Sequence, residues 1–388
     1  MFSRRLDWNQ SRNRIADRID EHRRAGRPLL DLTGSNPTLA GFTWPTDLLV
    51  PLADARGLAY EPDPRGMLSA RQAVAEYHGM TADGIALTAS TSEAYSYLFK
   101  LLADPGDEIL APQPSYPLFD FLAALESVSI VPYPLFYDHG WSIDLQALES
   151  RITPRSRAIV VVNPNNPTGS FLRTRELQAL EGMCAKHELA LISDEVFSDF
   201  AVAERPDPDW VGCVAKRATR AAAFSLSGLS KVCGLPQLKL GWIASNSRAA
   251  LERLELIADT FLSVSTPVQL ALPKLLAGRQ AIQGQIVSRV RANLAKLDSP
   301  LVMEGGWTAV VRVPQVKNDE DWVLDLLDQH GVLVQPGFFY DFPSGSHVVV
   351  SLLAPELEFA EGARRLNSAI GARLQSPDRK GGVPSSTA

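Results

Sequence analysis

The chain has 388 residues, of which 45% are hydrophobic and 21% are charged, and its formal net charge is −6. This composition excludes a largely disordered chain, and the negative charge argues against a nucleic-acid binder with a basic surface. The three cysteines are dispersed and no apolar run reaches the roughly 18 residues of a membrane span, so we expect free thiols, a cytoplasmic location and no membrane association.

The first two thirds of the chain predict an α/β fold. The N-terminus is highly charged, which is typical of a surface helix over 8–25 and not of a signal peptide. Short apolar runs then alternate with helical stretches, which predicts a mostly parallel sheet flanked by helices on both faces. The expected strands are 84–88, 108–111, 129–133, 158–163, 190–194, 221–225 and 240–244, and the expected helices are 91–103, 115–125, 174–187 and 249–262.

The pattern changes after about residue 280 and predicts a smaller α+β domain, against which the N-terminal helix packs. Helices are expected at 280–298, 319–330 and 355–371, and strands at 308–313, 332–335 and 347–352. We therefore divide the chain into an N-terminal arm with a small-domain segment (1–45), a large domain (46–280), a small C-terminal domain (281–375) and a tail (376–388) with the composition of a disordered segment.

Polar motifs follow two of the expected strands. In residues 87–93, Leu-Thr-Ala-Ser-Thr-Ser-Glu, Ser90 fits a helix N-cap and Glu93 completes a capping box. The free N–H groups and dipole of that helix, with three hydroxyls, suit a phosphate, although a plain capping box explains the same residues. Residues 163–169, Asn-Pro-Asn-Asn-Pro-Thr-Gly, form a rigid turn with more amides than a structural turn requires. Both motifs lie at the carboxyl end of a strand, where α/β proteins bind ligands.

Two charged residues follow other strands. Asp194 ends an apolar strand, and a carboxylate in that place needs a cationic partner, either a salt bridge or a protonated ring nitrogen of a cofactor. Lys231 and, eight residues later, Lys239 lie in a Ser- and Gly-rich loop. A lone loop lysine is usually a solvated charge, but this loop accompanies three other candidate sites. The six histidines are scattered and predict no metal site.

In this order the four motifs resemble the fold type I pyridoxal-phosphate enzymes, specifically the class I/II aminotransferase family, over residues 28–370. The resemblance implies an enzyme with pyridoxal 5'-phosphate as its cofactor. It implies transfer of an amino group between an amino acid or amine and a keto acid. It also implies a homodimer whose active site is shared across the interface.

The resemblance further assigns roles to single residues. Lys231 would be the catalytic residue that forms a Schiff base with the cofactor, Asp194 would pair with the ring nitrogen, and Asn166 would hydrogen-bond the ring oxygen. Tyr116 would stack on the ring, and Tyr60 would reach the phosphate of the neighbouring subunit. The other cofactor-binding residues that it implies are Ser90, Thr91, Ser92, Phe197, Ser230 and Lys239.

Three residues depart from the pattern of the family. Phe197 stands in place of a tyrosine, which removes a hydrogen bond to the ring oxygen. Lys239 stands in place of an arginine at the phosphate, which keeps the charge but loses the bidentate fork. Val349 stands in place of the arginine that binds the substrate α-carboxylate, and such a loss would weaken amino-acid binding by orders of magnitude.

Three explanations of Val349 are open. In the first, another arginine binds the carboxylate; the candidates are Arg312 and Arg65, and Ser35 is a further candidate for substrate binding. Arg312 fits an exposed strand residue without a role in binding equally well. Alternatively, the substrate has no α-carboxylate, or the enzyme is a lyase or decarboxylase on the same fold. We favour the substitute arginine and therefore an aminotransferase. A non-catalytic regulatory protein is least favoured, because the key residues of the family are present.

Overall fold

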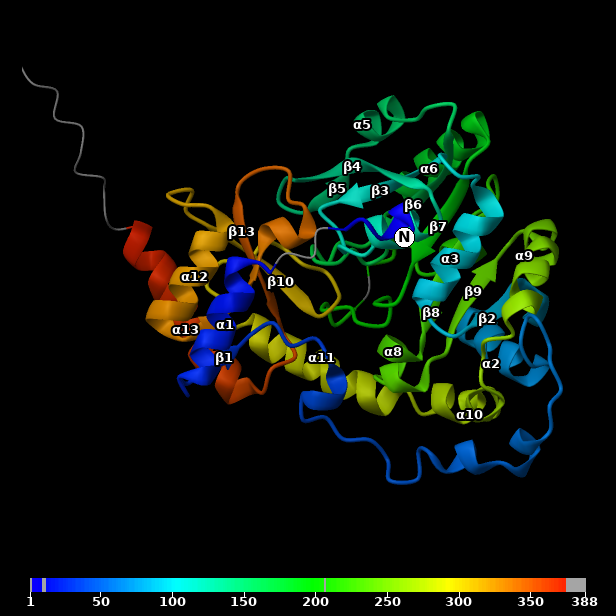
Figure 1. The fold of residues 1–388 in the computed structure, drawn as a ribbon, viewed down its shortest axis with the longest axis horizontal. Coiled ribbons are helices and arrows are strands. Elements are labelled where there is room, and N and C mark those ends of the chain that lie inside the picture. Colours follow the sequence, from blue (N-terminus) through cyan, green and yellow to red (C-terminus); the bar gives the residue numbers. More distant parts are fainter. Residues whose placement is uncertain (1, 9–11, 206, 375–388) are drawn as a thin grey trace, which may run out of the picture.

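An eight-stranded sheet forms the centre of the larger part of the molecule in the computed structural model, which describes residues 2–8, 12–205 and 207–374 (Figure 1). Its strand order is β2-β9-β8-β7-β6-β3-β4-β5. The central strands run parallel, whereas β9 and β5 run antiparallel to their neighbours. The strands are β2 Ile85–Thr88, β3 Glu108–Gln113, β4 Ser129–Tyr137, β5 Trp141–Ile143, β6 Ser156–Val162, β7 Ala190–Asp194, β8 Ala223–Gly228 and β9 Gly241–Ser245. The predicted α/β fold is confirmed.

Both faces of this sheet are covered by helices because its central strands are apolar on both sides. Along β6, Ala158 and Val160 face one core, whereas Ile159 and Val161 face the other. The first core is closed by α3, α4 and α9, and the second by α5, α6 and α7. A third core beside β2 and β9 is closed by α2 and α10. These helices are α2 Leu68–His78, α3 Thr91–Leu102, α4 Phe119–Leu125, α5 Leu145–Ser150, α6 Thr174–His187, α7 Val214–Arg217, α9 Arg248–Phe261 and α10 Thr266–Ala277.

The smaller part contains a three-stranded antiparallel sheet of order β10-β13-β12 and a parallel pair of β1 and β11. Its strands are β1 Leu30–Asp31, β10 Thr308–Val313, β11 Val332–Leu333, β12 Gln335–Pro336 and β13 Ser346–Ser351. Its helices are α1 Arg14–Arg24, α11 Gln280–Leu294, α12 Asp319–His330 and α13 Glu356–Leu374. The single strand expected at 332–335 is therefore wrong, because β11 and β12 belong to two different sheets.

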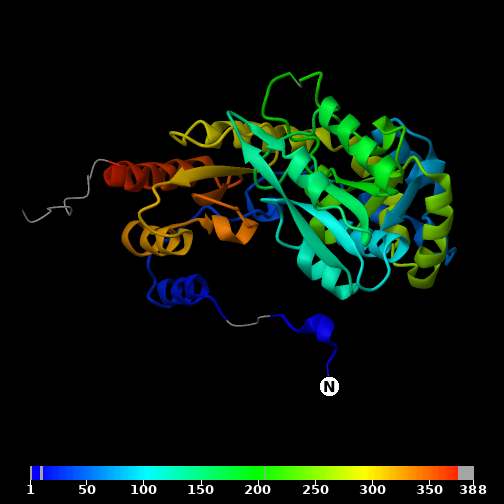
Figure 2. The same ribbon diagram turned by 90° about the horizontal axis from the view of Figure 1, so that it is seen from above.

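The N-terminal helix packs against this smaller part, next to α12 (Figure 2). Arg14 Nη1 lies 3.0 Å from Glu320 Oε2, and His22 Nε2 lies 3.0 Å from Asp328 Oδ1. The helix begins at Arg14 rather than at residue 8, because the Asn13 side chain accepts the N–H of Ala16 as an N-cap.

The hydrophobic core of the smaller part also takes in residues from elsewhere in the chain. Leu32 and Phe42 come from the N-terminal arm, and Phe197 and Phe200 come from the loop after β7. The proposed boundaries at 45 and 280 stay predictions, and the expected tail of 376–388 lies outside the described residues. Among the described helices, none is both long and apolar enough to cross a lipid bilayer. The short 3₁₀ turns are Arg4–Leu6, Pro37–Leu39, Val50–Ala53, Ala55–Leu58, Ala82–Gly84, Pro236–Leu238 and Gly337–Tyr340.

Candidate active site

A cleft of about 390 Å³ lies between the carboxyl ends of the central strands and the smaller sheet. It brings together every residue that the sequence analysis assigned to the cofactor except Tyr60, and it also contains Ser35. These lining residues are Ser90, Thr91, Ser92, Tyr116, Asn166, Asp194, Phe197, Ser230, Lys231 and Lys239. Residues from distant parts of the sequence thus converge on one cavity, at the sheet edge where the motifs predicted it.

Lys231 is enclosed by aromatic rings. It lies in α8 (Leu229–Val232), directly after β8. Its Nζ lies 4.8 Å from the ring centre of Trp307 and 5.4 Å from that of Phe197. Burial lowers the pKa of Lys231, and the charge of Asp194 partly opposes this effect. A lysine in such a setting offers an unprotonated, nucleophilic amine more readily than a solvated one does.

Asp194 is a buried carboxylate at the end of β7. Tyr95 donates its hydroxyl to Oδ2 at 3.1 Å, and the N–H of Val196 donates to Oδ1 at 3.2 Å. Burial nevertheless raises the pKa of Asp194 to about 6. Within the described residues no cation forms an ion pair with this carboxylate, so it is set up to receive a positively charged group from a ligand.

The three asparagines of the turn at 163–169 differ in their surroundings: two form hydrogen bonds that hold the loop, and one lines the cleft. Asn163 is held by Val211 O and the N–H of Leu172, and Asn165 Oδ1 accepts the Thr168 hydroxyl at 3.0 Å. Only Asn166 lines the cleft, where its Oδ1 accepts the hydroxyl of Thr308 at 3.3 Å. The turn therefore presents one amide to a ligand and uses the other two to fix its own shape.

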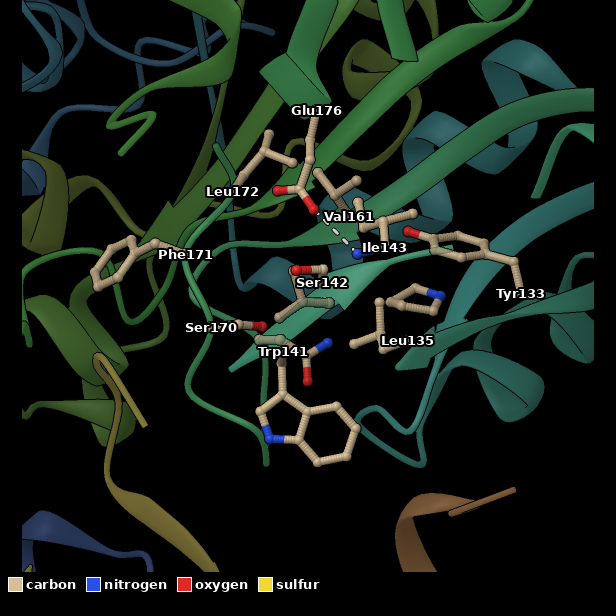
Figure 3. Close-up of a pocket in the computed structure, with 13 residues that line it drawn as sticks. Tyr133, Leu135, Trp141, Ser142, Ile143, Val161, Ser170, Phe171, Leu172 and Glu176 are labelled. Atoms are coloured by element: carbon tan, nitrogen blue, oxygen red, sulfur yellow. Dashed lines mark hydrogen bonds between the residues drawn. The ribbon is translucent and has the colours of Figure 1, made fainter. Parts of the chain in front are cut away.

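Behind this turn, a small cavity of about 20 Å³ separates it from the β4–β5 hairpin (Figure 3). Glu176 at the start of α6 accepts the N–H of Ile143 at 3.0 Å across the cavity. The space holds about one water molecule, which is too little for a substrate. The protein behind the turn is therefore closely packed.

The first turn of α3 lines the cleft at the place where the sequence predicts an anion. Ser90 Oγ accepts the N–H of Glu93 at 3.1 Å, as predicted for an N-cap. The predicted capping box is incomplete, because Glu93 accepts the N–H of Ala89 and the hydroxyl of Ser263 instead of the N–H of Ser90. The hydroxyls of Thr91 and Ser92 and the free N–H groups of this helix end thus remain available to a phosphate.

Gly241 at the start of β9 permits the close approach that forms this end. A Cβ atom at this position would lie 2.8 Å from the carbonyl carbon of Ser90 and 2.9 Å from the nitrogen of Thr91. Lys239, two residues earlier, has a φ of 50° and an exposed side chain that lines the cleft. Lys239 and the end of α3 thus line the same cleft, and the phosphate role that the resemblance implies for Lys239 stays a prediction.

The wall of the cleft formed by the smaller part is uncharged and combines the aromatic Trp307 and Phe339 with polar side chains. Thr308, Gln335, Tyr340 and Ser351 line it, and the Tyr340 hydroxyl donates to Gln335 Oε1. Val349 is fully buried in a cluster with Leu301, Val310 and Tyr340. Of the described residues that line the cleft, the only cations are Lys231 and Lys239.

The two candidate substitute arginines do not reach this cleft, which corrects that expectation. Arg312 lies on β10 four residues beyond Thr308, about 13 Å farther along the strand. Its guanidinium stands over the Tyr137 ring at 5.9 Å, in a different cavity. Arg65 donates from Nη2 to Asp83 O at 2.8 Å, before β2.

Tyr60 also lies outside the cleft, and 79% of its surface is exposed. It lines a separate groove with Met67 and Ser263. Because the implied contact of Tyr60 is with a second subunit, its role stays a prediction.

Sequence reasoning missed the contribution of the smaller part to the cleft. Trp307 lies against Lys231, and Thr308 and Gln335 form the opposite wall. The alternation of residues along strand 308–313 indicated which of them share a face, but no motif indicated what that face meets.

A second polar cluster, largely buried, includes Glu195, the residue that follows Asp194. His78, Glu195 and Cys213 bring three possible ligand atoms within 4.8 Å of one another. However, Trp242 Nε1 donates to His78 Nε2 at 2.8 Å, and Glu195 Oε1 accepts the hydroxyl of Ser225 at 2.6 Å. Burial raises the pKa of Glu195 to about 7. These hydrogen bonds account for the cluster without an ion.

Comparison with known proteins agrees with this geometry. The family profile "Aminotransferase class I and II" matches residues 35–354. The alanine aminotransferase of Mycobacterium tuberculosis is 29% identical over 374 residues, covering 88% of this chain and 86% of that protein. The glutamate-pyruvate aminotransferase AlaA of Escherichia coli K12 is 28% identical and covers 91% of this chain and 93% of that protein.

Solved structures show the same fold. The alanine aminotransferase from Pyrococcus furiosus superposes with a TM-score of 0.85 at 24% identity, over 96% of this chain and all of that one. The architecture and the cleft define an α/β protein with a lysine, Lys231, in a large cleft at the carboxyl ends of its central strands. More particularly, the chain belongs to the class I and II aminotransferase family and is an aminotransferase, and membership of this family implies dependence on pyridoxal phosphate. Nothing in the comparisons favours the lyase or decarboxylase alternative.

Proposed function

We propose that this aminotransferase holds pyridoxal 5'-phosphate in the 390 Å³ cleft and that Lys231 is the residue that binds the aldehyde carbon of the cofactor. The observation that carries the proposal is the pairing of a buried amine with a buried carboxylate that has no ion-pair partner among the described residues. The pKa of Lys231 is lowered and that of Asp194 is raised, both chiefly by burial. A ligand that reacts with the amine and carries a positive ring nitrogen satisfies both groups.

The neighbouring groups fit the rest of the cofactor. The N–H groups of the α3 end, the hydroxyls of Thr91 and Ser92, and Lys239 suit the phosphate. Asn166 offers an amide to the ring oxygen, and the half-exposed Tyr116 offers a ring face. Ser230 and Phe197 complete the surroundings of Lys231.

In the reaction, the cofactor supplies an electron sink for the substrate carbon that bears the amino group. Asp194 would hold the ring nitrogen in its protonated form by its negative charge. The Nζ of Lys231 would bind the cofactor at rest and, when free, would be placed to accept and donate a proton beside the substrate. The aromatic walls of Trp307 and Phe197 keep water from this amine.

We propose an amino acid as the donor and a 2-oxo acid as the acceptor. The names of the related alanine and glutamate-pyruvate aminotransferases support this substrate class. A second candidate, a donor amine without an α-carboxylate, is favoured by one observation: none of the described lining residues is an arginine. In the first case Ser35, Gln335 and Ser351 would meet the carboxylate with neutral donors. The comparison of matched substrates below separates the two cases.

We further propose a homodimer in which Tyr60 reaches the active site of the partner subunit. The segment from residue 39 to residue 60 exposes several large apolar side chains, and such surface is typical of an interface. They are Leu39, Leu49, Val50, Leu58 and Tyr60. A cytoplasmic location is supported by the three free thiols of Cys184, Cys213 and Cys233.

The experiment is the visible spectrum of the purified protein with pyridoxal phosphate, for the wild type, Lys231→Ala and the matched control Lys296→Ala, which alters an exposed lysine. We expect the band of lysine-bound cofactor in the wild type and in the control but not in Lys231→Ala. Tyrosine and tyramine differ only in the α-carboxylate. Bleaching by tyrosine alone would support an amino-acid donor, and bleaching by tyramine alone would support an amine donor. A band in all three proteins would refute the role of Lys231, and no band in any of them would refute the cofactor.

A further inference from the structure

A second large cleft, of about 760 Å³, lies away from the candidate active site. One wall is the β4–β5 hairpin of the large sheet, with Tyr137 and Trp141. The other wall is the end of β10, with Arg312, and the turn 342–347 that leads into β13. We call it the aromatic cleft. Its volume lies within the range of about 300–1,000 Å³ that small-molecule sites occupy.

The walls of the aromatic cleft form a continuous series of rings. The rings of Tyr137 and Trp141 lie 5.2 Å apart, those of Trp141 and Phe342 lie 6.0 Å apart, and those of Phe342 and His347 are stacked at 4.5 Å. Figure 3 shows the indole of Trp141 turned away from Glu176 and the interior of the large sheet. Such a surface favours a flat, apolar ligand.

The polar groups of the aromatic cleft favour a negative charge. Arg312 is exposed, and its guanidinium forms no ion pair or hydrogen bond with another described residue; it stands over the Tyr137 ring at 5.9 Å. None of the described residues that line the cleft is an aspartate or a glutamate. Among the described residues, neither the buried donor Trp141 Nε1 nor Nδ1 of His347, a residue only 5% exposed, has a hydrogen-bond partner. A site with a free guanidinium, spare polar groups and no acid is complementary to an anion.

We propose that the aromatic cleft binds a small aromatic carboxylate, whose ring packs on Trp141 and Phe342 and whose carboxylate pairs with Arg312. Burial, and secondly the charge of Arg312, lower the pKa of His347 to about 4, so at neutral pH His347 is an uncharged part of the wall. The two walls belong to different sheets, so a ligand in this cleft contacts both parts of the molecule. The proposal is independent of the assignment of the active-site residues.

The test is calorimetric titration of the cofactor-loaded enzyme with indole-3-acetate and with its neutral analogue indole-3-acetamide. The variant is Arg312→Gln, and the matched control is Arg248→Gln, which alters an exposed arginine on α9. We expect saturable binding of indole-3-acetate by the wild type and the control, and binding weakened about tenfold or more by Arg312→Gln. Indole-3-acetamide should bind the wild type and Arg312→Gln equally weakly. A thermal unfolding midpoint of unliganded Arg312→Gln equal to that of the wild type would show that the substitution leaves the fold intact.

Several results would overturn the proposal. Equal affinity of the wild type and Arg312→Gln for indole-3-acetate would show that the Arg312 guanidinium does not bind the carboxylate. Absence of saturable binding to the wild type at millimolar concentrations would show that the aromatic cleft does not bind such a ligand. A change in the visible spectrum of the cofactor over the same concentration range, in both proteins, would place the ligand in the active-site cleft. Displacement of indole-3-acetate by an equal concentration of inorganic phosphate would reduce the site to a simple anion site.

Discussion

Substitution of Gly241 by alanine tests how the proposed phosphate-binding end of α3 is formed. The added Cβ would lie 2.8 Å from the carbonyl carbon of Ser90 and 2.9 Å from the nitrogen of Thr91. Both are backbone atoms, so no side chain can rotate to relieve the contact. Either β9 or the start of α3 must move.

The size of that movement follows from the contact distances. Restoring ordinary van der Waals contact at 3.4 Å or more requires a displacement of about 0.6 Å, which exceeds the tolerance of about 0.5 Å for a preorganised site. Overpacking of this kind lowers the free energy of unfolding by about 1–3 kcal/mol. Because the strain falls on the backbone of Ser90 and Thr91, where we propose that the phosphate binds, cofactor affinity should also fall, by about tenfold or more.

A matched control separates strain in general from strain at the phosphate site. Gly84→Ala places a Cβ 3.0 Å from Ser245 O, at the opposite end of the same β2–β9 strand pair. Urea unfolding should show both variants destabilised, whereas titration of the cofactor-free proteins with pyridoxal phosphate should show weakened binding in Gly241→Ala only. Wild-type affinity in Gly241→Ala, or an equal loss in Gly84→Ala, would refute the reasoning.

Three further predictions concern single groups of the cleft. Ser90→Ala removes the N-cap of α3 and should lower the free energy of unfolding by about 1 kcal/mol in urea titrations; unchanged stability would mean that the cap contributes nothing. Lys239→Arg supplies the bidentate donor that is usual at this position in the family and should lower the dissociation constant for pyridoxal phosphate. A higher dissociation constant would contradict a phosphate role for residue 239. The pKa of Asp194 is raised to about 6 from 3.8, so the folded, cofactor-free protein binds this proton more tightly than the unfolded chain does. Its contribution to stability is therefore present at low pH and lost as the pH rises to about 6. The free energy of unfolding of the wild type should fall relative to that of Asp194→Asn between about pH 4 and pH 6. Parallel curves of unfolding free energy against pH for the two proteins would contradict the raised pKa.

The sequence predicted one side of the cleft well because the residues there follow strands in a parallel sheet. Asn166, Asp194 and Lys231 are far apart along the chain, but each comes after an apolar strand, and the carboxyl ends of parallel strands meet at one edge. Local pattern therefore sufficed to place them together. It did not show that Asn163 would be used to hold the turn, because its partners, Val211 O and the N–H of Leu172, lie outside the turn. Nor did it show that Asn165 would be taken up by a contact with Thr168 inside the turn.

The other side of the cleft could not be predicted from local pattern. Val349 lies opposite Val310 and Gln335 because of the register of three strands that are paired over long sequence distances. Because side chains alternate between the two faces of a strand, Thr308 and Arg312 are expected on the same face. This alternation does not show that Thr308 alone lies close enough to line the cleft. The choice of Arg312 as a substitute failed for this reason.

The replacement of tyrosine by Phe197 illustrates how a sequence departure changes meaning in three dimensions. From the sequence, it is the loss of a hydrogen bond. In the structure, the Phe197 and Trp307 rings meet edge to face at 5.2 Å and both stand beside Lys231 Nζ. A ring face stabilises an ammonium by about 0.5–2 kcal/mol, which opposes the desolvation that lowers the pKa of Lys231. The state of the amine is thus set by the balance between two effects of the same rings, the exclusion of water and the attraction of their faces for a positive charge. A hydroxyl at position 197 would alter both at once.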